Sequence, residues 1–461
     1  MDSATLAAEA CARLGFEPLP GQYLLVNALA AFITSHGPRD VFVLNGYAGT
    51  GKTSLVGAMV KAMREAKTPL VMLAPTGRAA KVASHFSGHA ASTIHKRLFR
   101  GNSLDPANST FFIAPNNDRD TVFFVDEASL IDDKGANGLL SLLTRHVYSA
   151  PGCAMVLVGD IAQLPPVGMA DSPAMNADRL RQLGLNPICH SLDVTVRQAA
   201  ESGILHNATI IRQAMAAQLD PARFHLVTRG MTDFVKISSR DLADTLADSW
   251  ASVGSDETLI ITRSNRRANN YNMAIRNLVM GADSPLQRGD RIIIAKNDYF
   301  WSRRNRLPHF IANGDSAEVT WVGKTEKMYG RYFTDVELRL SGDNAVVGAK
   351  VMLRSLATEG ASIPREEMER LYNRVLDAYE GELSHKILGV MNDEYYNALQ
   401  VKYGYCVTCH KAQGGQWRHV YIDMANIDPA AIGEDFYRWI YTSVTRATEK
   451  VFLINPTIPC R

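Results

Sequence analysis

The chain of 461 residues has few cysteines, no long apolar run and little excess of either charge sign. Because no stretch of about 18 consecutive apolar residues occurs, we expect no membrane-spanning helix and no membrane partner. The start Met1-Asp2-Ser3-Ala4 lacks a basic region followed by an apolar core, so we expect no secretory signal. Six cysteines are too few for a disulfide framework. These absences favour a reducing cytoplasm, either of a prokaryote or of a virus-infected cell.

The charge balance excludes a broadly basic protein of the histone type. The formal net charge is +2 and the pI is near 8.1. Any contacts with nucleic acid must therefore be concentrated in a local channel. Hydrophobic residues make up 46% and charged residues 21% of the chain, which is typical of a globular protein. The length suggests roughly three domains of about 150 residues each.

Short apolar runs alternate with helical stretches in the first part of the chain. Runs of this kind are typical of strands that are buried on both faces of a parallel sheet. We therefore predict a doubly wound α/β domain over residues 1–192, with a small subdomain or hairpin at about 96–120. The predicted strands are Val41–Leu44, Pro69–Ala74, Val122–Val125 and Ala154–Val158, and the predicted helices include Lys52–Ala66 and Gly135–His146.

The same alternation returns later in the chain and predicts a second α/β domain. Its two parts, residues 193–288 and 402–461, are separated by an insertion over residues 289–401. The predicted strands are Thr258–Thr262, Val420–Asp423 and Val451–Ile454, and the predicted helices are Asn265–Val279 and Glu434–Thr442.

The insertion alternates polar and apolar residues at Glu318–Val322 and Asp335–Leu340, which is typical of half-buried antiparallel strands. We expect a small β-barrel at about 290–355, followed by a helical subdomain. A stripe of apolar residues then follows at helical spacing. This helix could pack on its own domain at least as well as on a partner. The stripe consists of Met368, Leu371, Tyr372, Val375, Leu376 and Tyr379.

A phosphate-binding loop is the firmest local motif. Gly46–Thr53 fits the pattern G-x-x-x-x-G-K-[ST] in full, follows a predicted strand and opens a predicted helix. Backbone N–H groups can turn around phosphate oxygens there, and the helix N-terminus adds positive partial charge. We expect Lys52 to reach the β- and γ-phosphates of ATP and Thr53 to bind Mg²⁺. The loop residues predicted to bind the nucleotide are Gly46, Ala48, Gly49, Thr50, Gly51, Lys52, Thr53 and Ser54.

Two carboxylates follow the third predicted strand, in Phe123–Glu127. Ligands of such sheets bind at the carboxyl ends of the strands. Asp126 is placed to hold Mg²⁺ through its water shell, and Glu127 to orient or deprotonate the attacking water. The pair favours hydrolysis of ATP over transfer of its phosphate to a small molecule.

Further motifs indicate which class of phosphate-loop protein this is. With Gly159–Val167 the chain resembles superfamily-one helicases, and the resemblance covers nearly its whole length. It implies that Gln22 reads adenine and that Gln163 senses the γ-phosphate. It also implies a γ-phosphate arginine at Arg197 and an arginine finger at Arg446. Taken singly, Gln22 fits a solvated helix residue and Arg197 a surface ion pair equally well, but their joint occurrence in order favours the helicase interpretation.

The strand-contacting motifs of that family match Ala74–Ala80, Ser92–His95 and Thr408–Gly414. Individually, Thr76 could be a helix cap and His95 a core histidine. The resemblance of these three segments to the family's motifs nevertheless implies that they contact single-stranded DNA. The residues so implied are Pro75, Thr76, Gly77, His95, Thr408, His410 and Lys411.

The order and spelling of the motifs look most like the Dda/RecD-like branch, which the segments Gly289–Arg291, Lys296–Asp298 and Asn313–Asp315 also resemble. This resemblance implies two RecA-like domains, with an SH3-like barrel inserted in the second. It also implies a monomeric motor that moves 5′→3′ on single-stranded DNA and unwinds forked DNA. It implies roles in replication, repair or recombination, and single-strand-binding or replication proteins as further partners. A motor subunit of a nuclease complex, an RNA-directed motor and a phosphate-loop kinase remain alternatives.

Two weaker signals are open to more than one interpretation. Cys406 and Cys409 form a lone C-x-x-C, but structural zinc usually needs four ligands, so cysteines beside a buried strand fit better. Tyr299–Arg304 mixes aromatic and basic residues. That mixture fits contact with a strand or duplex and fits a surface loop equally well.

Overall fold

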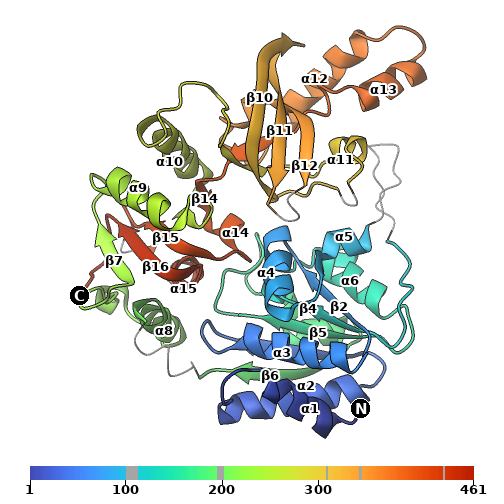
Figure 1. Cartoon of the computed structure of the whole chain (residues 1–461), viewed down its shortest axis with the longest axis vertical. Coiled ribbons are helices and arrows are strands. Elements are labelled where there is room, and N and C mark those ends of the chain that lie inside the picture. Colours follow the sequence, from blue (N-terminus) through green and yellow to red (C-terminus); the bar gives the residue numbers. More distant parts are fainter. Residues whose placement is uncertain (100–112, 195–201, 308–309, 342–344, 429–430) are drawn as a thin grey trace.

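The computed structural model describes residues 1–99, 113–194, 202–307, 310–341, 345–428 and 431–461. Within these residues the strands form three sheets. In Figure 1 the first sheet and its helices lie at the bottom, the second sheet at the left, and the third sheet with helices α12 and α13 at the top. No helix in the described ranges is long and apolar enough to cross a membrane.

The first sheet is parallel throughout and has the order β3-β2-β4-β5-β1-β6. Successive residues of its central strands enter two hydrophobic clusters, one beneath α1–α3 and one beneath α5–α7. The predicted parallel α/β fold is therefore confirmed. Its strands are β1 (Asp40–Gly46), β2 (Leu70–Ala74), β3 (Ala91–Thr93), β4 (Val122–Val125), β5 (Ala154–Gly159) and β6 (Asn186–Leu192).

The helices around the first sheet follow the prediction with one correction. A single helix over Gly135–His146 was expected, but a 3-10 turn at Gly135–Asn137 is followed by a separate helix, α6. Gly138 between them is extended, and a Cβ there would lie 2.3 Å from the backbone nitrogen of Lys134. The helices are α1 (Ser3–Ala12), α2 (Pro20–Ser35), α3 (Lys52–Glu65), α4 (Gly77–Ser87), α5 (Ile94–Leu98), α6 (Leu139–Val147) and α7 (Ala177–Gln182).

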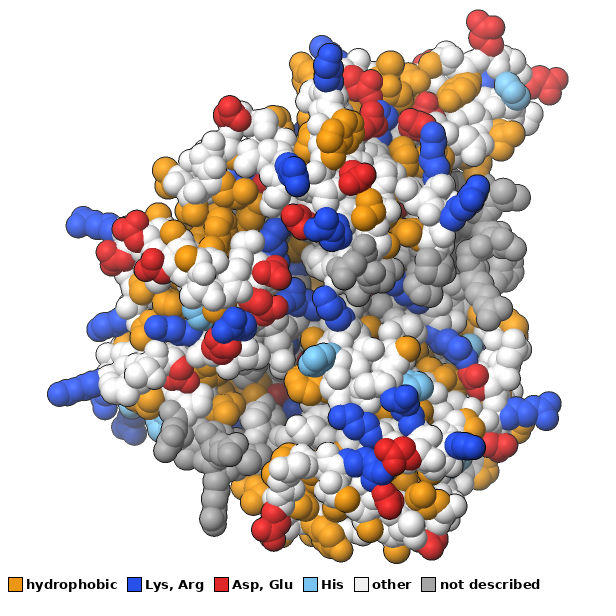
Figure 2. Space-filling model, in the orientation of Figure 1, with side chains coloured by type: hydrophobic (Ala, Val, Ile, Leu, Met, Phe, Trp, Pro, Cys, Tyr) orange, Lys and Arg blue, Asp and Glu red, His pale blue; other side chains and the backbone are white. Residues whose placement is uncertain are grey.

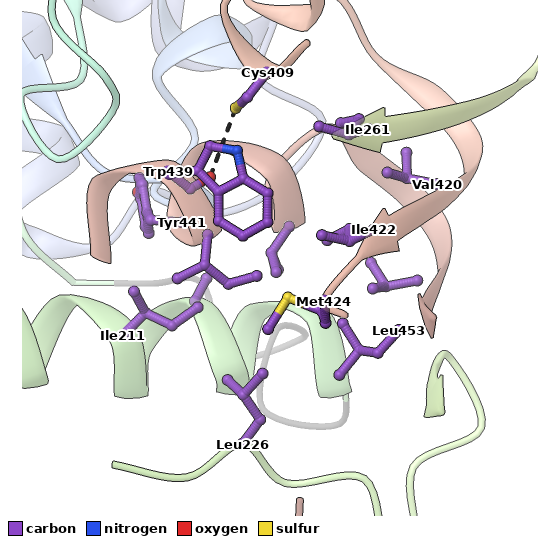
Figure 3. Close-up of a cluster of buried hydrophobic side chains, with 14 of the residues drawn as sticks. Ile211, Leu226, Ile261, Cys409, Val420, Ile422, Met424, Trp439, Tyr441 and Leu453 are labelled. Atoms are coloured by element: carbon purple, nitrogen blue, oxygen red, sulfur yellow. Dashed lines mark hydrogen bonds between the residues drawn. The ribbon is translucent and has the colours of Figure 1, made fainter. Parts of the chain in front are cut away.

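The second sheet is also parallel, with the order β14-β8-β15-β16-β7. Helices α8 and α15 bury one of its faces in a large hydrophobic cluster, part of which Figure 3 shows. Its strands are β7 (Phe234–Ile237), β8 (Thr258–Thr262), β14 (Cys406–Thr408), β15 (Trp417–Asp423) and β16 (Ala447–Ile454). Its helices are α8 (Gly203–Ala216), α9 (Leu242–Val253), α10 (Asn265–Leu278), α14 (Cys409–Ala412) and α15 (Glu434–Val444).

The third, inserted sheet is antiparallel and has the order β12-β11-β10-β9-β13. Val351 in β12 forms a bridge with Leu399 just before β13, so the two edges of this sheet meet at one point. Its interior and the other face of the second sheet form one hydrophobic cluster. The strands are β9 (Arg291–Ile294), β10 (Ser316–Met328), β11 (Arg331–Leu340), β12 (Val346–Met352) and β13 (Val401–Tyr403).

Three helices accompany the inserted sheet: α11 (Phe300–Arg304), α12 (Arg365–Asp377) and α13 (Leu383–Asn392). The apolar stripe of α12 packs against Phe333 and Met352 of the sheet, so it faces its own subdomain. Of the predicted hairpin insert, residues 100–112 lie outside the described residues. The exact domain boundaries stay predictions. Short 3-10 turns lie at Ala128–Leu130, Gly135–Asn137, Pro173–Met175, Pro221–Arg223 and Leu353–Ser355.

Charged side chains are intermixed on the surface. Figure 2 shows basic side chains spread over both the upper and the lower parts of the visible face, with acidic side chains among them. This distribution fits the small net charge of +2. A strongly charged site must therefore come from a local cluster of side chains.

Candidate nucleotide and strand-binding sites

The phosphate loop joins β1 to α3. Gly49 and Gly51 have φ values of 76° and 85°, a left-handed conformation that favours glycine. A Cβ on Gly46 would lie 2.6 Å from a side-chain carbon of Lys52, so a larger residue would displace the lysine. Lys52 Nζ donates hydrogen bonds to the carbonyl oxygens of Gly46 and, at 3.2 Å, of Tyr47. The loop thus holds a lysine over the positive N-terminal end of a 14-residue helix.

Gln22 forms a hydrogen bond with the backbone of the phosphate loop. Its side chain is 2% exposed, which excludes a solvated helix residue. Its Nε2 donates to the carbonyl oxygen of Thr50 (2.9 Å), and its Oε1 accepts from the N–H of Leu19 (2.9 Å). The glutamine therefore lies directly beside the phosphate loop, while its role in reading adenine stays a prediction.

Asp126 and Glu127 follow β4 at the same edge of the first sheet. Asp126 Oδ1 accepts from the N–H of Glu127 (2.9 Å), and Glu127 has a φ of 52°, an unusual conformation for this residue type. Burial, followed by the negative charge of Glu127, raises the pKa of Asp126 to about 7, and Lys52 opposes that shift. A divalent cation would stabilise the ionised carboxylate, so this oxygen donor set fits Mg²⁺.

Arg446 lies between α15 and β16 of the second sheet. It faces these carboxylates. Its Nη1 is 3.7 Å from Glu127 Oε1, and the residue is 3% exposed. Its guanidinium is fixed by the carbonyl oxygens of Thr442 (3.1 Å) and Gly415 (3.1 Å). A cation from one sheet thus faces the carboxylates of the other.

A chain of hydrogen bonds connects the phosphate loop to α15. The N–H of Ala48 donates to the hydroxyl oxygen of Tyr441 (2.9 Å), and that hydroxyl donates to Asp160 Oδ2 (2.7 Å). Ala48 and Asp160 lie in the motifs Gly46–Thr53 and Gly159–Val167, but of the three residues only Ala48 is predicted from the sequence to bind the nucleotide. The sequence carries no signal for the direction of the Tyr441 side chain.

Leu164, directly after Gln163, is held by the second sheet. Its N–H donates to Thr442 Oγ1 (2.8 Å), and its carbonyl oxygen accepts from Gln413 Nε2 (2.7 Å). Gln163 itself is buried, and its Oε1 has no hydrogen-bond partner among the described residues. Buried polar atoms without a partner are rare, so this amide fits a site for a polar ligand. Arg197, the other residue predicted to contact the γ-phosphate, lies outside the described residues.

The predicted strand-contacting residues of the first sheet lie around the start of α4. Thr76 is the N-cap of α4 and accepts from the N–H of Ala79 (3.2 Å). A Cβ on Gly77 would lie 2.6 Å from Asp315 Oδ1, next to the inserted sheet. A Cβ on Gly414 would lie 2.9 Å from Thr76 Oγ1. The backbone from Pro75 to Gly77 therefore lies where the first sheet approaches both other sheets.

His95 lies in α5, near the same edge. Its ring is half-buried and 5.7 Å from the ring of Phe99. Burial lowers its pKa, which favours the neutral imidazole. The structure therefore permits both packing and contact with a strand.

Thr408, His410 and Lys411 lie at the start of α14. His410 and Lys411 are exposed, whereas Cys409 between Thr408 and His410 is buried. Figure 3 shows that the Cys409 thiol lies in the core of the second sheet, where Sγ is 3.6 Å from the carbonyl oxygen of Trp439. Burial raises the pKa of Cys409 to about 12. Cys406 belongs to the cluster on the opposite face, so the two thiols are separated by the sheet.

The aromatic segment Tyr299–Arg304 forms α11 with its N-cap, and its rings are largely packed. Trp301 is buried, and its Nε1 donates to the carbonyl oxygen of Asn397 (2.9 Å). The rings of Tyr299 and Phe310 lie 4.9 Å apart. The segment thus forms part of the inserted subdomain instead of an open surface loop.

The fold and the site define a phosphate-loop nucleotide-binding protein in which two parallel α/β sheets face each other. Residues 21–228 match the family described as AAA domain, and residues 403–454 match the UvrD-like helicase C-terminal domain. The chain is 34% identical over 131 residues to the ATP-dependent RecD2 DNA helicase of Deinococcus radiodurans, covering 27% of this chain and 16% of that protein. It is 26% identical over 259 residues to the ATP-dependent DNA helicase dda of Enterobacteria phage T4, covering 54% and 55%.

The uncharacterized protein R530 of Acanthamoeba polyphaga mimivirus is 21% identical to the chain over 500 residues, with 94% of this chain and 99% of that protein covered. A crystal structure of Pif1 helicase from Bacteroides with ADP-AlF3 and ssDNA aligns with a TM-score of 0.49 and 13% identity, covering 95% and 92% of the two chains. The matched domains and relatives confirm the resemblance to superfamily-one helicases of the Dda and RecD type.

Proposed function

We propose that this protein is an ATP-dependent DNA helicase that moves 5′→3′ on single-stranded DNA and unwinds forked duplexes. The observation that carries the proposal is the composite site, in which Arg446 of the second sheet lies 3.7 Å from Glu127 of the first. A site completed by two separate sheets couples nucleotide chemistry to their relative movement. The names of the RecD2 and dda relatives support DNA as the track.

In this mechanism Lys52 and the loop amides hold the β- and γ-phosphates, and Gln22 lies beside the base. Glu127 orients the attacking water, while Arg446 compensates the charge that develops on the phosphate oxygens. Thr53 and Asp126 would hold Mg²⁺, which neutralises part of the phosphate charge when bound. Gln163 and Arg197 are proposed to contact the γ-phosphate.

Hydrogen bonds between the sheets provide the mechanical coupling. Tyr441 contacts both Ala48 and Asp160, so the position of α15 depends on the conformation of the phosphate loop. Closing and opening of this interface would move the strand contacts of α4 and α14 relative to each other. We propose that the inserted sheet is an SH3-like barrel that guides the strand.

Two measurements test the proposal. ATP hydrolysis should rise strongly when single-stranded DNA is added, and a duplex with a 5′ tail should be unwound faster than one with a 3′ tail. Hydrolysis that ignores DNA would exclude the helicase function, and preference for the 3′ tail would exclude the proposed polarity. RNA in place of DNA, at equal length, tests the choice of track, because only RNA offers a 2′-hydroxyl. Vigorous unwinding by the isolated chain would weaken the alternative of a motor subunit in a nuclease complex.

A further inference from the structure

A small pocket lies where the chain passes from the inserted sheet into the second sheet. It is lined by side chains from α10, β13, β14 and α14, among them Asn265, Asn269, Lys402, Thr408 and Lys411. Thr408 and Lys411 belong to the proposed strand-contacting motif. Asn265, Asn269 and Lys402 have no role in the function described above.

Lys402 has an unusual environment. It is 7% exposed, and its Nζ donates a hydrogen bond to the carbonyl oxygen of Thr358. Asn269 Nδ2 donates to the same oxygen (2.9 Å). Within the part of the chain that the structure describes, Lys402 forms no ion pair with a carboxylate. Since an ammonium group has three N–H donors and buried lysines are usually paired, this charge lacks a counterion.

The charged groups around Lys402 increase the imbalance. Lys411 on α14 and Arg354 in the turn Leu353–Ser355 are both cationic. Burial lowers the pKa of Lys402 to about 8, and Lys411 and Arg354 add to that shift. Arg354 is itself only loosely paired, at 3.7 Å from Glu367. The electrostatic potential in the pocket is therefore positive, and a bound anion would stabilise the neighbouring cationic side chains.

Lys350 of the inserted sheet shows what a structural buried lysine looks like in this protein. It is 3% exposed, but its Nζ contacts Asp335 (2.8 Å) and Glu326. Hydrogen bonds to these carboxylates outweigh burial, so the pKa of Lys350 is raised. Both lysines are buried, and among the described residues only Lys350 has carboxylate partners that balance its charge.

We propose that the pocket around Lys402 binds one backbone phosphate of the translocated single strand. Lys402 and Lys411 supply positive charge, and the amides of Asn265 and Asn269 with the hydroxyl of Thr408 supply further donors. Asn269 keeps a second N–H free for this purpose, because an amide has two. A phosphodiester carries one negative charge and no base identity, so the contact is independent of sequence. This inference rests on the proposed function and adds a phosphate site at the joint between the second sheet and the inserted sheet.

The test uses the full chain with the substitution Lys402→Met and a fluorescent oligothymidylate, titrated over a series of salt concentrations. We expect the Kd to rise about tenfold, as for one lost charge-assisted hydrogen bond. The slope of log Kd against log salt should become shallower by about 0.7, the value for one single-strand phosphate. The matched control is Lys350→Met, which also removes a buried lysine and should leave the slope unchanged.

Thermal unfolding of each variant checks that it is folded. Lys411→Ala, at an exposed position, provides a second variant that should reduce the slope without risk to the core. An unchanged slope in folded Lys402→Met overturns the phosphate site even if Lys411→Ala reduces the slope, because Lys411 already belongs to the proposed strand-contacting motif. If the unsubstituted protein binds oligothymidylate but only the slope prediction fails, the proposed function stands without this site. If the unsubstituted protein does not bind at all, both are rejected.

Discussion

The two parallel sheets join strand to helix in different ways at their functional edges. In the first sheet α3 begins after Gly51, which has no side chain to cap the helix. In the second sheet α10 begins after Ser264, whose Oγ accepts from the N–H of Arg267 (3.3 Å). A helix capped by its own serine has part of its N-terminal N–H groups occupied, whereas the glycine-capped loop leaves them for a ligand. Of these two junctions, the first is therefore built to hold the phosphates of a nucleotide, whereas the second sheet contributes an arginine to that site.

Removal of the phosphate-binding lysine should have the largest effect. Lys52→Ala takes away the cation that faces the transferred phosphate, so we expect ATP hydrolysis to fall by about 10³-fold or more. Steady-state phosphate release with and without single-stranded DNA measures this. A rate of hydrolysis close to that of the unsubstituted protein would mean that the loop Gly46–Thr53 does not bind the phosphates during catalysis.

Removal of the arginine from the second sheet tests the other half of the comparison. Arg446→Ala should slow hydrolysis by about 10³-fold, at the lower end of arginine-finger effects, while ATP binding persists. Binding of a fluorescent ATP analogue and turnover are measured on the same sample. Arg418→Ala is a suitable control, because Arg418 is an arginine of the same sheet whose carboxylate partner is Glu449 (2.6 Å). Normal turnover by Arg446→Ala would contradict the two-sheet site.

The hydroxyl of Tyr441 joins the two halves directly, so its loss should have an intermediate effect. Tyr441→Phe removes the hydrogen bonds to Ala48 and Asp160. We expect the KM for ATP to rise about fivefold to tenfold, in line with the loss of buried hydrogen bonds. Tyr437→Phe serves as the control, because its hydroxyl lies on the same helix but donates to Leu219 (3.3 Å) within the second half. Equal effects of the two substitutions would show that the link between the halves has no special role.

The smallest predicted effect concerns stability without nucleotide. Because the pKa of Asp126 is raised from 3.8 to about 7, the folded protein binds more protons than the unfolded chain between these values. The free energy of unfolding therefore falls as the pH rises through this window. Asp126→Asn removes the titration, so its Tm should exceed that of the unsubstituted protein by about 2–4 °C at pH 8. Calorimetry from pH 4 to pH 8 should show this difference shrinking toward pH 4, and a difference that does not vary with pH would contradict the assignment.

The local parts of the site could be predicted from the residues themselves. Arg446, which lies near Glu127, was expected only through the family resemblance, and the other long-range contacts could not be predicted. Gly46–Thr53 has a fixed spacing that follows directly from the geometry of a phosphate cradle. By contrast, the sequence does not say where the Tyr441 hydroxyl points or that Lys402 is buried without a carboxylate, because both depend on packing between distant segments. The split of the helix at Gly138 also escaped prediction. The extended backbone of Gly138 ends the preceding turn, and the close approach of Lys134 leaves no room for a Cβ at this position.

The inserted sheet and the second sheet share one hydrophobic cluster, which includes Ile260 and Phe452 of one and Ile292 and Val336 of the other. Cores of this kind transmit displacement because they are close-packed. The two sheets should therefore turn as a single lever arm when the interface at Arg446 closes. A small rotation near the phosphate loop would then become a larger excursion at the far tip formed by α12 and α13, which Figure 1 places at the opposite end of the molecule from α1 and α2.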